Sequence, residues 1–290
     1  MEDWKAVLKA DPTQWLLEEE DPSVRYLALK DLLGRPEGDG EVQSARLEIM
    51  RSGPVPELLQ KMCEPSYAQA YPGFYTRKYG GLSWSLIMLA ELCAQAGPQI
   101  KEQCEYILDH AQERTDGGFA MHTAAKTGGG RLSEVIPCLT GNMVFSLIRL
   151  GCLDDPRVQK AIAWLVKFMR FNDGVEIEPQ DPPYDRYEMC WGKHTCLMGV
   201  VKALKAFAAI PAEKRTPGVE ATLQKAAEFL LIHHIHKRSR QLNRVSKPGW
   251  LKFGFPLMYQ TDALEILDIL TGLSIKDSRM EESVQAVVGK

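Results

Sequence analysis

The feature that most constrains the fold is a regular order of helical segments with no strand-like segment among them. Apolar residues recur at helical spacing along most of the chain, and no stretch alternates between apolar and polar residues over the length of a strand. Pairs such as Gly97-Pro98 and Asp155-Pro156 separate one helical segment from the next. The sequence therefore predicts an all-α protein.

The predicted helices alternate between two kinds. The segments 82–96 and 138–150 are apolar nearly all round, whereas 157–171 and 213–232 carry one charged face. Helices that are apolar on all sides belong inside a protein, and helices with a charged face belong at its surface. This order predicts pairs made of one inner and one outer helix.

The inner helix of each pair begins at a nearly regular interval. Successive starts lie 58, 57, 56 and 65 residues apart, at Ser23, Gly81, Cys138, His194 and Tyr259. Repeated helical hairpins are typical of an open solenoid or of a closed double ring. In a closed ring, the loops before the inner helices would gather at one mouth. We expect residues 1–290 to form a single domain of this kind.

Composition excludes several classes of protein. Hydrophobic residues make up 45% and charged residues 25%, which is the balance of a soluble globular protein. The net charge of -3 gives no general attraction to nucleic acid or membrane surfaces. No apolar run is long enough to span a bilayer, and the N-terminus lacks the pattern of a signal peptide. We expect a cytoplasmic protein with no membrane span and no nucleic-acid partner.

Cysteine and histidine residues near helix starts form a candidate metal site. Seven cysteines scattered over the chain do not indicate a disulfide framework. Cys190 and His194 are spaced i, i+4, so on a helical turn they would share a face. Thiolate and imidazole ligands together favour zinc. We predict zinc held by Cys138, Cys190 and His194, with Cys196, His122 or water as fourth ligand; alternatively, these residues pack helix ends.

Two local motifs carry a family resemblance. They are the turn 116–119 (Asp-Gly-Gly-Phe) preceded by Gln112, and the segment 194–199 (His-Thr-Cys-Leu-Met-Gly). With the repeats, they resemble the superfamily of terpene cyclases and protein prenyltransferase β-subunits, in a prokaryotic branch. The resemblance implies an α/α toroid, here an incomplete ring, and makes His194 a zinc ligand like the histidine of farnesyltransferase β-subunits. The resemblance also places Cys138 at a ligand position. Ile136 stands where that family has an aspartate ligand, and Cys190 is the candidate that would replace this missing ligand.

A basic cluster near residue 240 is a candidate anion site. Five full positive charges fall within eleven residues and could bind a diphosphate. No aromatic side chains suited to base stacking lie among them, which argues against nucleic acid. The alternative is a solvated loop after a long helix. The cluster comprises His233, His234, His236, Lys237, Arg238, Arg240, Arg244 and Lys247.

Loop aromatics and one aspartate complete the candidates. Trp191 and Tyr259 are candidates for contacting a substrate, and Asp262 is a candidate catalytic carboxylate or, alternatively, a helix-start residue. The other loop aromatics either line an isoprenoid-sized apolar cavity or fill the core. They are Tyr67, Tyr71, Phe74, Tyr75, Tyr79, Trp250, Phe253 and Phe255.

Two functions of different classes fit these patterns. The first is a prenyltransferase-like or terpene-cyclase-like enzyme that acts on an isoprenoid or other apolar molecule, with zinc activating a thiol. The second is a non-catalytic toroid that holds a lipid or a protein partner, with a structural zinc or none. Fold alone decides neither.

Overall fold

A computed structural model describes residues 4–68, 73–174, 177, 179–186 and 188–290. The chain is mostly helical, as the apolar periodicity predicts. The prediction of a purely α-helical chain is wrong at one place, where β1 (Lys237–Arg238) and β2 (Gln241–Val245) form an antiparallel hairpin. The helix before this hairpin ends at a turn in which His234 and Ile235 have left-handed φ values of 42° and 67°. The chain therefore leaves the helical path there and continues into β1.

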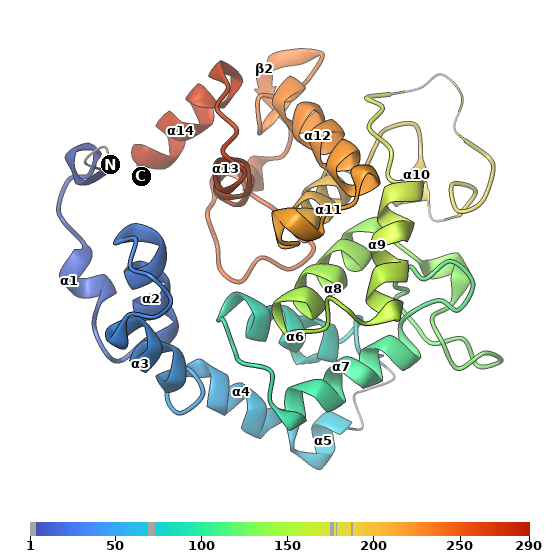
Figure 1. The fold of residues 1–290 in the computed structure, drawn as a ribbon. Coiled ribbons are helices and arrows are strands. Elements are labelled where there is room, and N and C mark those ends of the chain that lie inside the picture. The colour runs from blue at the N-terminus through green and yellow to red at the C-terminus, as the bar shows by residue number, and fades with distance from the viewer. Residues whose placement is uncertain (1–3, 69–72, 175–176, 178, 187) are drawn as a thin grey trace.

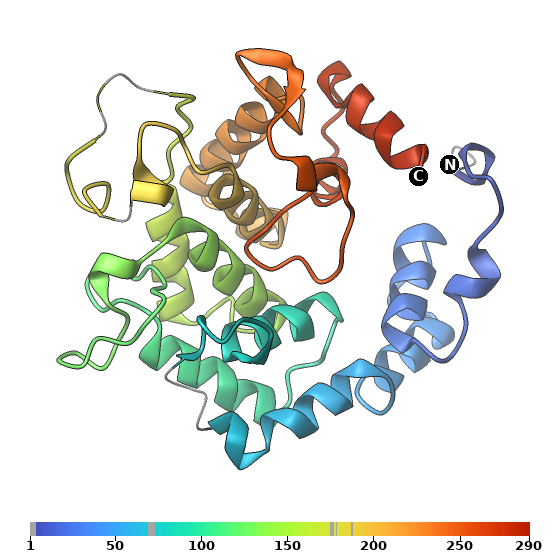
Figure 2. The same ribbon diagram turned by 180° about the vertical axis from the view of Figure 1, so that it is seen from behind.

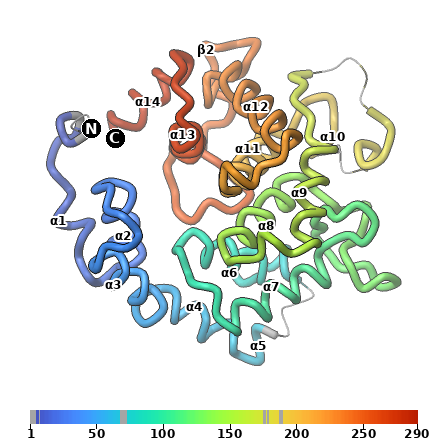
Figure 3. Tube along the Cα trace, viewed as in Figure 1, coloured from blue at the N-terminus to red at the C-terminus, as the bar shows by residue number. Residues whose placement is uncertain are grey.

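The first third of the chain forms short helices that follow one another around one side of the molecule (Figures 1 and 3). Most are bounded by Gly or Pro, which explains their brevity. They are η1 (Trp4–Val7), α1 (Thr13–Leu16), α2 (Pro22–Leu27), η2 (Ala28–Leu32), α3 (Gly40–Glu48), α4 (Pro54–Met62), α5 (Pro65–Ala68) and η4 (Lys78–Gly80).

The rest of the chain is a series of helical hairpins. Within each hairpin the two helices contact each other, and the first helices of successive hairpins also pack together, α6 on α8, α8 on α11 and α11 on α13. Short elements lie between them: η5 (Leu132–Glu134), α10 (Glu188–Trp191), η6 (Ala212–Lys214), η7 (Pro248–Leu251) and η8 (Ser278–Met280). The hairpins are α6 (Leu82–Glu91) with α7 (Pro98–His110), α8 (Pro137–Arg149) with α9 (Pro156–Phe168), α11 (Leu197–Ala208) with α12 (Pro217–Ile232), and α13 (Ala263–Gly272) with α14 (Glu281–Val288).

The helices α8 and α11 form the centre of the core. Every residue of α8 except Arg149 is buried. A side chain at Gly141 of α8 would meet the backbone of Lys202 in α11, because an added Cβ would lie 2.5 Å from its carbonyl carbon. Seen from behind, the segment around η7 that leads to α13 crosses the middle of the view (Figure 2).

Several helix boundaries differ from those that the sequence predicts. The helix expected over 82–96 ends at Glu91, since the chain turns through Cys93 with a φ of 59°. Asp21 caps α2 by accepting a hydrogen bond from the Val24 amide, whereas the hydroxyl of Ser23, the predicted start of an inner helix, donates to the Leu92 carbonyl. Helices α12 and α13 begin later than expected because Thr216 and Asp262 cap them.

A buried ion network lies between α6, α11 and α13. The Lys202 ammonium, fully buried, contacts both Glu265 carboxylate oxygens at 2.7 and 2.8 Å. Lys205 pairs with the same carboxylate at 3.0 Å and also with Glu91. The described part of the chain contains no helix long and apolar enough to cross a membrane.

Candidate functional site

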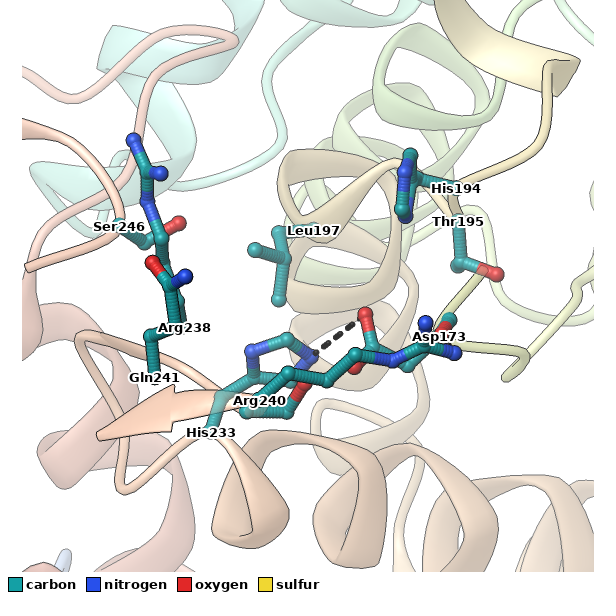
Figure 4. A pocket seen from close by; sticks show the side chains of 10 residues that line it. Asp173, His194, Thr195, Leu197, His233, Arg238, Arg240, Gln241 and Ser246 are labelled. Atoms are coloured by element: carbon teal, nitrogen blue, oxygen red, sulfur yellow. Dashed lines mark hydrogen bonds and ion pairs between the residues drawn. The ribbon is translucent and has the colours of Figure 1, made fainter. Parts of the chain in front are cut away.

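A cleft of about 410 Å³ opens where four segments meet, and we call it the histidine cleft (Figure 4). These segments are the loop after α9, the start of α11, the end of α12 and the β1–β2 hairpin. It therefore combines the two regions in which the sequence places the metal and anion sites. Its lining residues are Asp173, His194, Thr195, Leu197, His233, Arg238, Ser239, Arg240, Gln241 and Ser246.

Backbone pairing fixes one wall of the histidine cleft. Asp173 and His194 form an antiparallel bridge, and the Thr195 hydroxyl accepts a hydrogen bond of 3.1 Å from the Asn172 amide. Gly174 has a φ of 84°, and an added Cβ there would lie 3.1 Å from the His194 ring and 3.3 Å from the Arg240 guanidinium. Glycine thus lets both side chains pack over the turn.

His233, the residue after α12, presents one ring nitrogen to the cleft. Its Nδ1 lies 3.1 Å from the Lys237 carbonyl oxygen, which can only accept, so Nδ1 carries the proton. Its Nε2 is buried and has no hydrogen-bond partner among the described residues. An oxygen of the Asp173 carboxylate lies 3.7 Å from this Nε2 (Figure 4). Nε2 can therefore accept a hydrogen bond from a ligand, and the Asp173 carboxylate would stabilise positive charge placed on the ring.

Two arginines make the cleft attractive to anions. The Arg240 guanidinium donates a hydrogen bond of 2.8 Å to the Asp173 carbonyl, which holds it at the rim. The exposed Arg238 has no side-chain hydrogen bond or ion pair within the described ranges, so its donors are available to a ligand. Among the lining residues that the structure describes, Asp173 alone carries a carboxylate. Planar guanidinium groups match phosphate and carboxylate oxygens.

The rest of the basic cluster points elsewhere. Lys237 pairs with Glu282, and the His236 Nδ1 lies 2.7 Å from the Ser283 hydroxyl, so both side chains contact α14. His234, Arg244 and Lys247 do not line the cleft. Of the predicted anion-binding residues, the structure therefore brings together His233, Arg238 and Arg240.

The three predicted thiol ligands gather behind the cleft, and we call them the thiol cluster: Cys138, Cys190 and Cys196. Cys138 is the second residue of α8, Cys190 lies in α10, and Cys196 immediately precedes α11. The Cys190 thiol donates a hydrogen bond to the Cys196 sulfur, which lowers the pKa of Cys196 to about 6 and raises that of Cys190. Burial raises the pKa of Cys138 to about 12.

His194 does not join the thiol cluster. The helical spacing of Cys190 and His194 requires a continuous helix, but α10 ends at Trp191 and α11 begins at Leu197. His194 instead pairs its backbone with Asp173 and lines the histidine cleft. Across the residues with described positions, no three His, Cys, Asp or Glu side chains are arranged to hold a metal ion. The described side chains thus form no ready zinc site, and zinc binding stays a prediction.

Four other candidates lie outside the cleft. His122 places its Nδ1 2.7 Å from Glu134 in an outer loop. Asp262 is buried and caps α13 by accepting from the Glu265 amide at 2.9 Å, and burial raises its pKa. Tyr259 packs against Trp84 with ring centroids 5.9 Å apart, and Trp191 packs between Trp164 and Tyr184.

The loop aromatics divide between core and surface. Tyr67, Phe74 and Trp250 are buried in the core, whereas Tyr79 and Phe255 are exposed. Tyr71 lies outside the described residues.

Two charged residues beside the candidate sites, Asp173 and Arg170, were not predicted from the sequence. Asp173 belongs to an Asn-Asp-Gly turn that ends a helix, and such turns are too common to indicate a site. Arg170, two residues beyond α9, donates hydrogen bonds to the Trp191 and Gly192 carbonyls at 2.8 and 2.9 Å. Only the folded structure places either residue beside the candidates from residues 190–240.

Comparison with known proteins adds no relative. No protein-family model matches the chain, and no curated protein matches it.

Proposed function

We propose that the protein binds a small molecule with an anionic head group, such as a diphosphate, in the histidine cleft, and that His233 exchanges a proton with it. The observation that carries this proposal is the buried Nε2 of His233, which has no hydrogen-bond partner among the described residues. It faces a cleft that is also lined by Arg238, whose side chain pairs with none of these residues. A buried acceptor without a partner costs free energy, and a bound ligand that donates a proton or hydrogen bond would recover it.

The apolar part of the ligand follows from the family resemblance, which implies an isoprenoid. We further propose that the hairpins are part of an α/α toroid, supported by the consecutive packing of α6, α8, α11 and α13. On this proposal the protein is a transferase or cyclase, with Arg238 and Arg240 holding the head group and His233 as the acid–base residue.

The anion site is tested by calorimetric titration with inorganic pyrophosphate and with farnesyl diphosphate. An arginine that hydrogen-bonds to an anion contributes about 1.5–3 kcal/mol, so Arg238→Ala should weaken binding roughly ten- to a hundred-fold. Arg244→Ala is the matched control, because Arg244 lies on the same hairpin outside the cleft. Equal binding by wild type and Arg238→Ala would refute the anion site.

The role of His233 is tested without a known reaction. Titration in two buffers of different ionisation enthalpy measures the protons taken up when pyrophosphate binds. We expect uptake in the wild type and less uptake in His233→Asn, with binding retained because both arginines remain. Identical uptake in the two proteins would remove His233 from the proposal. A protein that binds neither probe would instead favour a non-catalytic toroid that binds a lipid or a protein.

A further inference from the structure

A second polar cavity, which we call the Arg149 cavity, lies at the opposite end of α11 from the histidine cleft. It is formed by α2 and η2, α3 and the loop before it, the turn after α6, and the ends of α8 and α11. The histidine cleft includes Leu197 at the start of α11, whereas this cavity includes Ala209, directly after its end. The 12 residues of α11 span about 18 Å, so the two sites are separate. The Arg149 cavity has a volume of about 300 Å³, at the lower end of the range for small-molecule sites.

Positive charge is in excess in the Arg149 cavity. Its cationic lining residues are Lys30, Arg46 and Arg149, and of the lining residues that the structure describes only Glu37 carries a carboxylate. The Tyr26 hydroxyl donates a hydrogen bond of 3.0 Å to this carboxylate. Lys30 and Arg46 pair with the same group at 2.8 and 3.4 Å. Three positive charges against one negative charge leave an excess of two, which attracts a further anion.

Arg149, the last residue of α8, is the cation of this cavity that lacks a counter-charge. Its guanidinium donates a hydrogen bond of 3.2 Å to the Cys93 sulfur, which is a weak acceptor. Within the described ranges it forms no ion pair with a carboxylate, and the residue is exposed. A guanidinium carries five N–H donors in a planar fork that matches the two oxygens of a carboxylate. Arg149 can therefore bind an anion that enters the cavity from solvent.

We propose that the Arg149 cavity binds a small organic carboxylate with a short apolar body, the size of a six-carbon fatty acid. Apolar side chains adjoin the charged groups, since Ala94 and Ile148 are buried in the wall of the cavity and Leu153 is half-buried there. The ligand carboxylate would pair with Arg149, and its apolar body would cover these side chains. The Glu37 carboxylate, held by a hydroxyl and two cations, shows that the donors of this cavity suit that group. This inference is independent of the histidine cleft.

The Cys93 thiol reports whether the cavity is occupied, because it lines the cavity beside Arg149. The full-length protein is alkylated with iodoacetamide in the presence of excess hexanoate or of potassium chloride at the same ionic strength. Trypsin then releases Cys93 on peptide 79–101 and the exposed Cys63 on peptide 62–77, which mass spectrometry quantifies separately. We expect hexanoate to slow alkylation of Cys93 and to leave Cys63 unchanged, and hexanamide, its neutral analogue, to protect neither. An unprotected Cys93, or equal protection by hexanamide, would overturn the proposal.

Two arginine variants separate this site from general attraction to anions. In calorimetric titration with hexanoate, Arg149→Ala should weaken binding at least about tenfold, the value of a hydrogen bond to a charged group. Arg51→Ala is the matched control, because it removes the same charge from an exposed position outside the cavity, and it should bind hexanoate as the wild type does. Arg149→Ala should also keep its affinity for pyrophosphate, which we assign to the histidine cleft. Equal weakening of hexanoate binding in both variants would refute the site at Arg149.

Discussion

At the scale of single residues, His236 is a buried imidazole that joins the β1 strand region to α14. Its Nδ1 lies 2.7 Å from the Ser283 hydroxyl, and its Nε2 lies 4.0 Å from the Glu282 carboxylate. Burial, and next the positive charge of Lys237, lower the pKa of His236 below its ordinary value of 6.5. The folded protein therefore holds this side chain neutral under conditions in which the unfolded chain would bind a proton.

This difference makes stability depend on pH. Below about pH 6.5 the unfolded state takes up a proton that the folded state resists, so the contribution of His236 is full above that pH and is lost as pH falls through the lower folded value. We expect the urea midpoint to fall between about pH 7.5 and about pH 5.5. The fall should be smaller in His236→Asn, and an equally steep fall in that variant would contradict the prediction.

Site residues could be predicted from the sequence where their role follows from the type of residue and its place near a helix start. They could not be predicted where the role depends on a contact between distant segments of the chain. Cys138 and Cys196 both belong to helix starts, and the sequence places them together. The i, i+4 spacing pairs His194 with Cys190 only in a continuous helix, and residues 192–196 are not helical. A backbone bridge to Asp173 carries the imidazole into the neighbouring cleft, and nothing in the local pattern indicates this long-range pairing.

At the scale of helices, the contact between α8 and α11 depends on a glycine. A Cβ at Gly141 would lie 2.5 Å from the Lys202 carbonyl carbon, a distance that requires the two backbones to move apart. We expect Gly141→Ala to lower the free energy of unfolding by about 1–3 kcal/mol, as overpacking does in cores. Gly272→Ala in α13 is the control, because nothing lies within 4 Å of its added Cβ. It should be neutral or stabilise by up to about 1 kcal/mol in chemical denaturation, and equal losses would refute the close contact.

Helical hairpins could be predicted because apolar periodicity and Gly or Pro boundaries act locally. The helices α8 and α9, for instance, begin at Pro137 and Pro156, each one residue before the start that the sequence predicts. The β1–β2 hairpin could not be predicted, because the segment from Lys237 to Val245 is polar and shows no strand-like alternation. The left-handed turn at His234 and Ile235, which comes just before β1, ends the helix there. That turn also brings the Lys237 carbonyl to the His233 ring, so the missed element is the one that orients the proposed acid–base residue.

At the scale of the whole molecule, buried charges connect helices that are far apart in the sequence. Glu265 of α13 contacts Lys202 and Lys205 of α11, and Lys205 continues to Glu91 of α6. Burial opposes ionisation of Glu265, but the two ammonium groups outweigh it and lower its pKa. Burial also lowers the pKa of Lys202. The lysine therefore depends on its carboxylate partner to remain charged in the core.

Removing one charge should thus cost more than removing both. Glu265→Gln leaves the Lys202 ammonium buried without a full counter-charge, so we expect a loss of about 3–5 kcal/mol in the free energy of unfolding. Lys202→Met combined with Glu265→Leu removes the buried pair and should recover most of this loss, because Lys205 keeps Glu91. Lys214→Ala, which breaks an exposed pair with Asp154, should cost at most about 1 kcal/mol. Denaturant unfolding of the wild type and the three variants measures these free energies. A double variant no more stable than Glu265→Gln would mean that packing between α11 and α13, and not charge compensation, determines the loss of stability.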